Sequence, residues 1–263
     1  MGIVNVTPDS FSDGGRWAAP EAALMHAQQL VASGANIIDV GGESTRPGAG
    51  RVDPETERMR VIPVVAALAD AGIAVSIDTM NASTAVAAAE AGALIINDVS
   101  GGLADPAMID AAAQTGLHYV AMHWRGHLGA GPERSHYDDV VADVRDALAA
   151  RVDALLGAGV LRERIVLDPG LGFSKLTEHN WQLLGRLSEL QQLGFPVLIG
   201  ASRKRFLGTL LPEGVAVEER DLPTAVVSVL SAQSGAWGVR VHDVAATCIA
   251  LDTLSSWQSG ERA

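Results

Sequence analysis

The chain is poor in several residue types, and each shortage narrows the classes of protein to which it can belong. Its 263 residues include one cysteine, Cys248, so no internal disulfide can form and a reducing compartment is expected. Cys248 stands in an apolar helical pattern, which predicts a small buried core residue. No apolar run approaches the roughly 20 residues that a membrane span needs. The first residues also lack the basic and apolar regions of a signal peptide, so we expect a cytoplasmic protein that does not insert into membranes.

Positive charge is scarce as well. The net charge is −12, and only two lysines occur, Lys175 and Lys204. A chain this acidic is a poor general binder of nucleic acid, and an anionic ligand would require a local concentration of cations. The densest basic run is Arg203-Lys204-Arg205. The sequence leaves two readings open, an anion site or a solvated helix face.

Short apolar runs recur along the whole chain, separated by longer helical patterns and by no linker. The runs are Ile3-Val4, Ile37-Ile38, Val75–Ile77, Leu94–Ile96, Tyr119–Met122, Ile165–Leu167, Val197–Ile199 and Val239–Val241. The clearest helical patterns are Pro20–Ala32, Pro54–Ala69, Ala82–Ala91, Asp138–Leu156, Glu178–Gln192 and Pro223–Ser234. Strands that alternate with helices form parallel sheets. Eight units of about 30 residues favour one closed (β/α)8 barrel over residues 1–263.

A doubly wound open sheet is the alternative architecture. Its usual dinucleotide fingerprint, G-x-G-x-x-G after the first strand, is missing, and Gly170-Leu171-Gly172 lacks the third glycine. There is also no glycine-rich loop ending in lysine of the kind that binds nucleotide phosphates. The barrel is therefore the preferred prediction.

Polar residues stand where the apolar runs end. They are Asn5, Asp39, Asp78, Asn97-Asp98, Asp168, Ser202–Lys204, and Arg240 with His242. In a barrel these positions converge on the C-terminal mouth of the strands, where active sites are built. Any single one of them could be a helix N-cap, and Asp39 and Asp98 fit as caps or loop anchors. Taken together they predict a ring of carboxylates, amides and cations around one cavity.

Two details strengthen the prediction of a site. Arg240 and His242 alternate with Val239 and Val241, so both should point to the same side of the last strand. Two polar groups inside a barrel are costly unless a partner or ligand satisfies them. The loops at residues 7–15 and 41–48 are long and rich in Gly, Pro, Ser and Asp, which is typical of lids that exclude water.

The same residues resemble a known family. Asn5-Val-Thr-Pro-Asp-Ser-Phe-Ser-Asp-Gly14 and Asp39-Val-Gly-Gly-Glu-Ser-Thr-Arg-Pro-Gly48 look like the two loop signatures of the dihydropteroate synthases. Shorter matches follow in order at Ser76–Thr79, Ile96–Val99, Asp168–Gly170, Gly172-Phe173, Ser202–Lys204 and Arg240–His242. Each short match is weak alone, but the ordered set covers essentially the whole chain.

The resemblance implies an enzyme that joins a dihydropterin diphosphate to p-aminobenzoate. It implies that Asp78, Asn97, Asp168 and Lys204 bind the pterin, and that Arg240, His242 and Asn5 grip the diphosphate. Catalysis would rest on Lys204, Arg240 and Asp78. The p-aminobenzoate ring would lie among Phe11, Thr45, Pro47 and Phe173, with its carboxylate at the helix start after Ser202. Some relatives place a small hydroxyl residue where Arg205 stands, which leaves the role of Arg205 open.

The resemblance also implies Mg2+, with Asn5 as its protein ligand, and a homodimer. The five histidines His118, His123, His127, His136 and His179 are scattered and suggest no zinc site. Two alternatives remain open on the residues. One is a methyltetrahydrofolate-binding methyltransferase module, and the other is an inactive pterin-binding paralogue. A paralogue should have lost some strand-end groups, and none is missing here.

Overall fold

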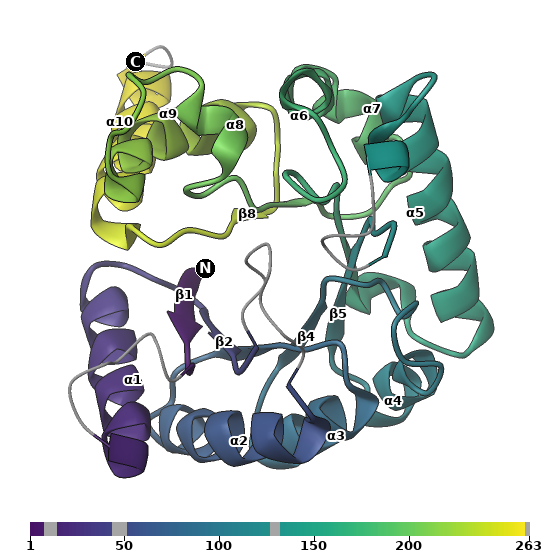
Figure 1. Ribbon diagram of the computed structural model, residues 1–263, viewed down its shortest axis with the longest axis vertical. Coiled ribbons are helices and arrows are strands. Elements are labelled where there is room, and N and C mark those ends of the chain that lie inside the picture. Colours follow the sequence, from purple (N-terminus) through teal and green to yellow (C-terminus); the bar gives the residue numbers. More distant parts are fainter. Residues whose placement is uncertain (8–14, 44–51, 127–131, 261–263) are drawn as a thin grey trace.

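A parallel β-barrel surrounded by helices forms the structure (Figure 1). The computed structural model describes residues 1–7, 15–43, 52–126 and 132–260. The strands are β1 (Gly2–Asn5), β2 (Ile38–Gly41), β3 (Val75–Asp78), β4 (Ile95–Asp98), β5 (His118–Met122), β6 (Ile165–Asp168), β7 (Leu198–Ile199) and β8 (Gly238–Val239). Each of the eight predicted runs therefore overlaps a strand.

The sheet closes on itself. Strands β1 to β6 pair in sequence order, and β7 pairs with β8, all in parallel. A bridge between Leu167 and Val197 joins β6 to the β7 segment, and a bridge between Gly2 and Val241 joins the β8 segment to β1. The (β/α)8 barrel is thus confirmed and the open doubly wound sheet is wrong.

Helices cover the outside of the barrel (Figure 1). They are α1 (Gly15–Ala32), α2 (Pro54–Asp70), α3 (Ala82–Glu90), α4 (Met108–Thr115), α5 (Val140–Gly157), α6 (Thr177–Gly185), α7 (Leu187–Gln191), α8 (Arg205–Gly208), α9 (Asp221–Gln233) and α10 (Val244–Gly260). Within the described ranges, none of these helices is both long and apolar enough to cross a membrane.

Three expectations about helices need correction. Helix α1 begins at Gly15, so Pro20 lies inside it rather than at its start. The range predicted as one helix over 178–192 is two helices that meet at Arg186, whose φ is −117°. Gly185 favours the break because glycine is a poor helix former, and the Arg186 guanidinium is tied to Asp139 at 2.9 Å. Cys248 is half-buried on α10 rather than fully buried.

Strand alternation produces two apolar layers. Val4, Ile38, Ile77, Ile96 and other outward-facing residues pack against the helices in the main core. A smaller cluster is formed by Ile95, Val120, Val166 and Leu198, with Met1 and Ile37 packed against it. These residues alternate with the helix-facing ones, so they fill the barrel interior. The interior is therefore apolar at this level, which leaves the polar strand ends to line the mouth.

A buried carboxylate supports the loop that follows β3. Glu57 on α2 is 1% exposed, and its Oε2 accepts hydrogen bonds from Thr79 Oγ1 (2.9 Å), Asn81 Nδ2 (2.9 Å) and Thr84 Oγ1 (2.6 Å). These bonds tie α2 to the β3–α3 connection, which follows Asp78 in the chain. Their geometry makes Glu57 a structural acceptor.

We predict that Glu57→Ala lowers the free energy of unfolding by about 3 kcal/mol, because three buried donors lose their acceptor. Urea denaturation measures this change. The matched control is Glu55→Ala on the same helix, where the side chain is exposed and the change should stay within about 0.5 kcal/mol. Equal effects of the two substitutions would contradict the assigned role.

Candidate active site

Polar side chains from several strands meet at the mouth of the barrel. Asp39 (0% exposed), Asn97 (3%) and Asp168 (6%) are buried. Asp78 ends β3 and is paired with Asn97 of β4 in the strand register. The predicted convergence of these strand ends is therefore what the structure shows.

Arg240 joins two of these carboxylates. Its Nε donates to Asp39 Oδ2 and its Nη2 donates to Asp78 Oδ2, both at 2.6 Å. Asn97 Nδ2 donates to the same Asp39 oxygen at 3.0 Å. The guanidinium from the β8 segment thus links β2 and β3 across the mouth, and it is 21% exposed. A guanidinium has five N–H donors, so it can hold both carboxylates and still offer donors to a ligand.

The charges in this cluster shift one another. Burial raises the pKa of Asp78 to about 7, an effect that Arg240 opposes and that the nearby Asp39 carboxylate reinforces. Burial disfavours the charged form of Arg240, but Asp39 and Asp78 outweigh that effect and raise its pKa. Arg240 is therefore permanently charged, whereas Asp78 can exchange a proton near neutral pH.

Lys204 and Asp168 form the other side of the mouth. Asp168 Oδ1 accepts from Gly170 N at 2.7 Å, and Lys204 Nζ donates to the carbonyl of Leu171 and lies 4.6 Å from the Phe173 ring centre. Burial raises the pKa of Asp168 and lowers that of Lys204 to about 8, while each charge counteracts the shift of the other. Both groups approach Gly200, where an added Cβ would lie 3.6 Å from Asp168 Oδ2 and 3.8 Å from Lys204 Nζ.

Ser202 and His242 are brought together as neighbours. Ser202 Oγ and His242 Nδ1 are 2.9 Å apart, and the backbone N–H of His242 donates to the same hydroxyl at 3.1 Å. This contact joins the loop after β7 to the segment after β8. Asn5 ends β1 and is half-buried.

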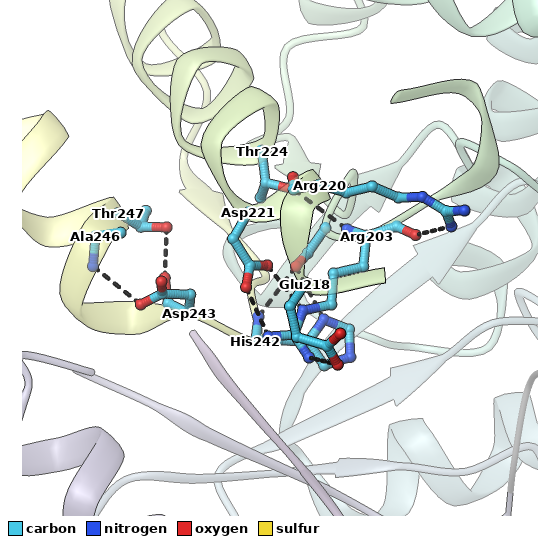
Figure 2. A network of polar contacts seen from close by, with 10 residues as sticks. Arg203, Glu218, Arg220, Asp221, Thr224, His242, Asp243, Ala246 and Thr247 are labelled. Carbon is cyan, nitrogen blue, oxygen red and sulfur yellow. Dashed lines mark hydrogen bonds and ion pairs between the residues drawn. The ribbon is translucent and has the colours of Figure 1, made fainter. Parts of the chain in front are cut away.

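The three residues of the basic run 203–205 have different roles. Arg203 adopts a positive φ of 58° and makes two hydrogen bonds to Asp221, at 2.8 and 2.6 Å, while its backbone N–H donates to Thr224 (Figure 2). Arg220 Nη1 donates to the Arg203 carbonyl at 3.0 Å. Arg203 therefore fastens the loop to α9, Lys204 reaches the mouth, and Arg205 is exposed.

Asp39 and Asp98 behave differently, although the sequence allowed both to be loop anchors. Asp98 accepts from Ser100 N, Gly102 N and Tyr119 Oη, and so anchors the loop after β4. Asp39 faces the barrel interior and contacts Arg240, so reading it as a cap is wrong. The signal was present in the alternation Ile38-Asp39-Val40, which sends the aspartate to the side opposite two buried aliphatic residues.

Lys175 lies close to the site, although the sequence alone did not assign it there. Its Nζ lies in the turn after β6, in contact with His123 and two backbone carbonyls. The His123 contact joins this turn to the segment after β5, and neither it nor the local contacts leave a periodic signal in the sequence. Phe11, Thr45 and Pro47, which were also predicted to line the site, lie outside the described residues.

Comparison with known proteins places this geometry in a family. A model of the pterin binding enzymes matches residues 1–242. The dihydropteroate synthase of Mycobacterium leprae (strain TN) is 53% identical over 267 residues, which cover 98% of this chain and 92% of the relative.

Solved structures of the Xanthomonas albilineans dihydropteroate synthase agree. The complex with 4-aminobenzoic acid has a TM-score of 0.91 at 45% identity, and the complex with 7,8-dihydropteroate has 0.88 at 43%. Each covers 100% of this chain and 93% of the solved one. The chain therefore belongs to the pterin binding enzymes and, among them, to the dihydropteroate synthases.

Proposed function

We propose that the chain condenses (7,8-dihydropterin-6-yl)methyl diphosphate with 4-aminobenzoate, giving 7,8-dihydropteroate and diphosphate, a step of folate biosynthesis. The observation that carries the proposal is the paired cluster of Asp39, Asp78 and Arg240 beside Asp168 and Lys204 at the barrel mouth. The Xanthomonas albilineans dihydropteroate synthase has been solved with 4-aminobenzoic acid and, separately, with 7,8-dihydropteroate, and we carry both ligands over to this chain.

The pterin would lie against the buried polar strand ends. Its pyrimidine edge presents N–H donors and acceptors that match the carboxylates of Asp168 and Asp78 and the amide of Asn97. A site of this kind rejects ligands that leave its buried polar groups unpaired. Lys204, which lies near Asp168, would also donate to the ring. The Arg240 guanidinium is planar and can stack on the ring while it holds phosphate oxygens.

Diphosphate would bind towards Arg240, Ser202, His242 and Asn5. Chemistry then proceeds by cleavage of the C–O bond, with the electron pair leaving on diphosphate. The pterin-conjugated carbon carries positive charge, which Asp78 stabilises. The amine of p-aminobenzoate attacks this carbon, forms the C–N bond and loses one proton. Phe173, with Phe11, Thr45 and Pro47, would hold the aromatic ring.

The residues at this end of the mouth fit an Mg2+ ion that would bind together with the diphosphate. Among the described residues no group of three or more His, Cys, Asp or Glu side chains could hold a metal. Mg2+ commonly uses one or two protein oxygens and completes its shell with phosphate and water. Asn5 would supply one carbonyl oxygen, and the ion would add to the neutralisation of the leaving group.

The proposal is tested by mixing the protein with both substrates and Mg2+ and detecting dihydropteroate by mass spectrometry. Dihydropteroate should form, and a sulfonamide should inhibit its formation because it mimics p-aminobenzoate. A dissociative path further predicts diphosphate release, or a trapped cation, when p-aminobenzoate is left out. Complete absence of both would favour concerted displacement, and absence of product would favour an inactive paralogue or a methyltransferase module.

Asp168 and Arg240 should contribute to different parts of substrate binding. Calorimetry would compare the pterin diphosphate with the corresponding pterin alcohol, which lacks phosphate. Asp168→Ala should weaken both ligands at least about 100-fold, because each loses a buried charged partner. Arg240→Lys keeps the charge but not the planar fork, and should weaken the diphosphate at least about tenfold more than the alcohol, because only the diphosphate also loses phosphate contacts. Exposed Asp153→Ala is the control.

Two outcomes would remove these assignments. Unchanged pterin affinity in Asp168→Ala would exclude it from the pocket, and equal losses for both ligands in Arg240→Lys would exclude a phosphate role. In the same titrations Asn5→Ala should abolish only the gain in affinity that Mg2+ provides.

The proposal includes a homodimer formed through α9 and α10. Leu222, Val226 and Leu230 recur every four residues along α9 and are 74%, 51% and 55% exposed. Ile249 and Trp257 are similarly exposed on α10, which packs beside α9 (Figure 1). An apolar stripe of this length is costly in water, and a second copy of the chain would cover it.

We predict that the double substitution Val226→Glu and Leu230→Glu halves the mass measured by light scattering, because the charges oppose burial. Met59→Glu, at an exposed apolar position on α2, should leave the mass unchanged. A monomeric unsubstituted protein would overturn the dimer without touching the proposed reaction.

We also place the protein in the cytoplasm, on the basis of its single cysteine.

A further inference from the structure

Both lysines of the chain converge on one turn, residues 170–175 between β6 and α6. Lys204 arrives from the loop after β7, and its ammonium contacts the carbonyl of Leu171. Lys175 belongs to the turn itself, and its Nζ donates to the carbonyls of Gly170 (3.0 Å) and Phe173 (3.2 Å). In a chain of net charge −12, both lysine ammonium groups therefore contact the backbone of the same short segment.

The ammonium of Lys175 is fully matched by acceptors. Its third contact is His123 Nδ1, at 2.9 Å. Burial, together with the Lys175 charge, lowers the pKa of His123 to about 2, so the ring is neutral and can accept at Nδ1. An ammonium has three N–H donors, and here three acceptors surround it. Burial, followed by the neighbouring Lys204 and Arg125 charges, lowers the pKa of Lys175 well below its usual value, and only the Asp168 carboxylate opposes this shift.

The turn requires such support because its backbone is tightly bent. Gly170, Gly172 and Ser174 all have positive φ, at 68°, 76° and 47°. A Cβ at Gly170 would lie 2.3 Å from the carbonyl oxygen of His123, so the two loops are in close contact. A non-glycine residue in this conformation is strained and persists only where its surroundings hold it.

A second side chain holds the same turn from its far end. Tyr137 Oη donates to the carbonyl of Ser174 at 3.0 Å. The Tyr137 ring is itself fixed by the Arg125 guanidinium, 3.8 Å from the ring centre, and by the edge of His179 at 5.1 Å. Lys175 and Tyr137 therefore restrain the turn through different atoms.

We propose that Lys175 is a positioning residue for the second substrate: it fixes the turn 170–175 and so holds the Phe173 ring beside the Lys204 ammonium. The turn carries both Phe173, whose ring lies beside the Lys204 ammonium and whose carbonyl accepts from Lys175, and Leu171, whose carbonyl accepts from Lys204. This inference rests on the proposed function, in which Phe173 contacts p-aminobenzoate. Lys175 touches neither substrate and acts only through the turn.

The test compares Lys175→Met and Tyr137→Phe with a matched control, Arg162→Met. Arg162 also caps backbone carbonyls, those of Leu193 and Gly194, and also lies over an aromatic ring, Phe195 at 4.1 Å. It precedes β6, so it sits at the end of the strand opposite the mouth. The three substitutions remove similar contacts in different places.

We expect Lys175→Met to raise the KM for p-aminobenzoate at least about tenfold and Tyr137→Phe about threefold, since small displacements of a positioning group weaken productive binding. The calorimetric Kd of the pterin diphosphate should stay within about threefold in both. Arg162→Met should change neither constant, although its melting temperature can fall.

An unchanged KM for p-aminobenzoate in both Lys175→Met and Tyr137→Phe overturns the proposal. An equal loss of affinity for both substrates also overturns it, because that result would indicate only general destabilisation. If Lys175→Met does not fold, Tyr137→Phe alone decides. Failure of the proposed function is separate, because the unsubstituted protein would then form no dihydropteroate at all.

Discussion

The ion pairs between Arg240 and the carboxylates of Asp39 and Asp78 are the constraint on which the mouth depends. Each contact is 2.6 Å long, and Asp39 is completely buried. A buried charge without its partner costs several kcal/mol, so none of the three groups can be removed alone without consequence. Because Arg240 precedes Val241, which closes the barrel onto β1, barrel closure and the assembly of the site involve the same short segment.

An acidic chain can bind an anionic substrate when its few cations are concentrated in one place, even though cations are not numerous overall. Arg240, Lys204 and Lys175 face Asp39, Asp78 and Asp168 at one end of the barrel, so the cluster is nearly neutral. Asp168 interacts with all three cations, which joins the arginine side of the mouth to the lysine side. A diphosphate would therefore meet a local field unlike that of the protein as a whole.

The sequence predicted the fold well because strand periodicity is local. All eight apolar runs overlap strands, and the polar residues that follow them do meet at one end. It failed where contacts between distant segments decide the outcome. Asp39 looked like a cap until its partner Arg240, 201 residues later, was placed beside it. Lys175 has no periodic context at all, and Arg186, where the predicted helix breaks, is paired with Asp139 from another part of the chain.

The retention of so many buried charges at the mouth is itself an argument for function. Replacing a buried ion pair by well-packed apolar side chains is often neutral or stabilising, so stability alone does not require Arg240, Asp39 and Asp78. Just beneath them the barrel interior is filled by Ile95, Val120, Val166 and Leu198. Apolar packing of this kind avoids the free-energy cost of burying charges. The change from aliphatic to charged residues occurs where the strands reach the loops. That position is useful to a ligand and to little else, which is why the polar strand ends, and not the barrel as such, identify the reaction.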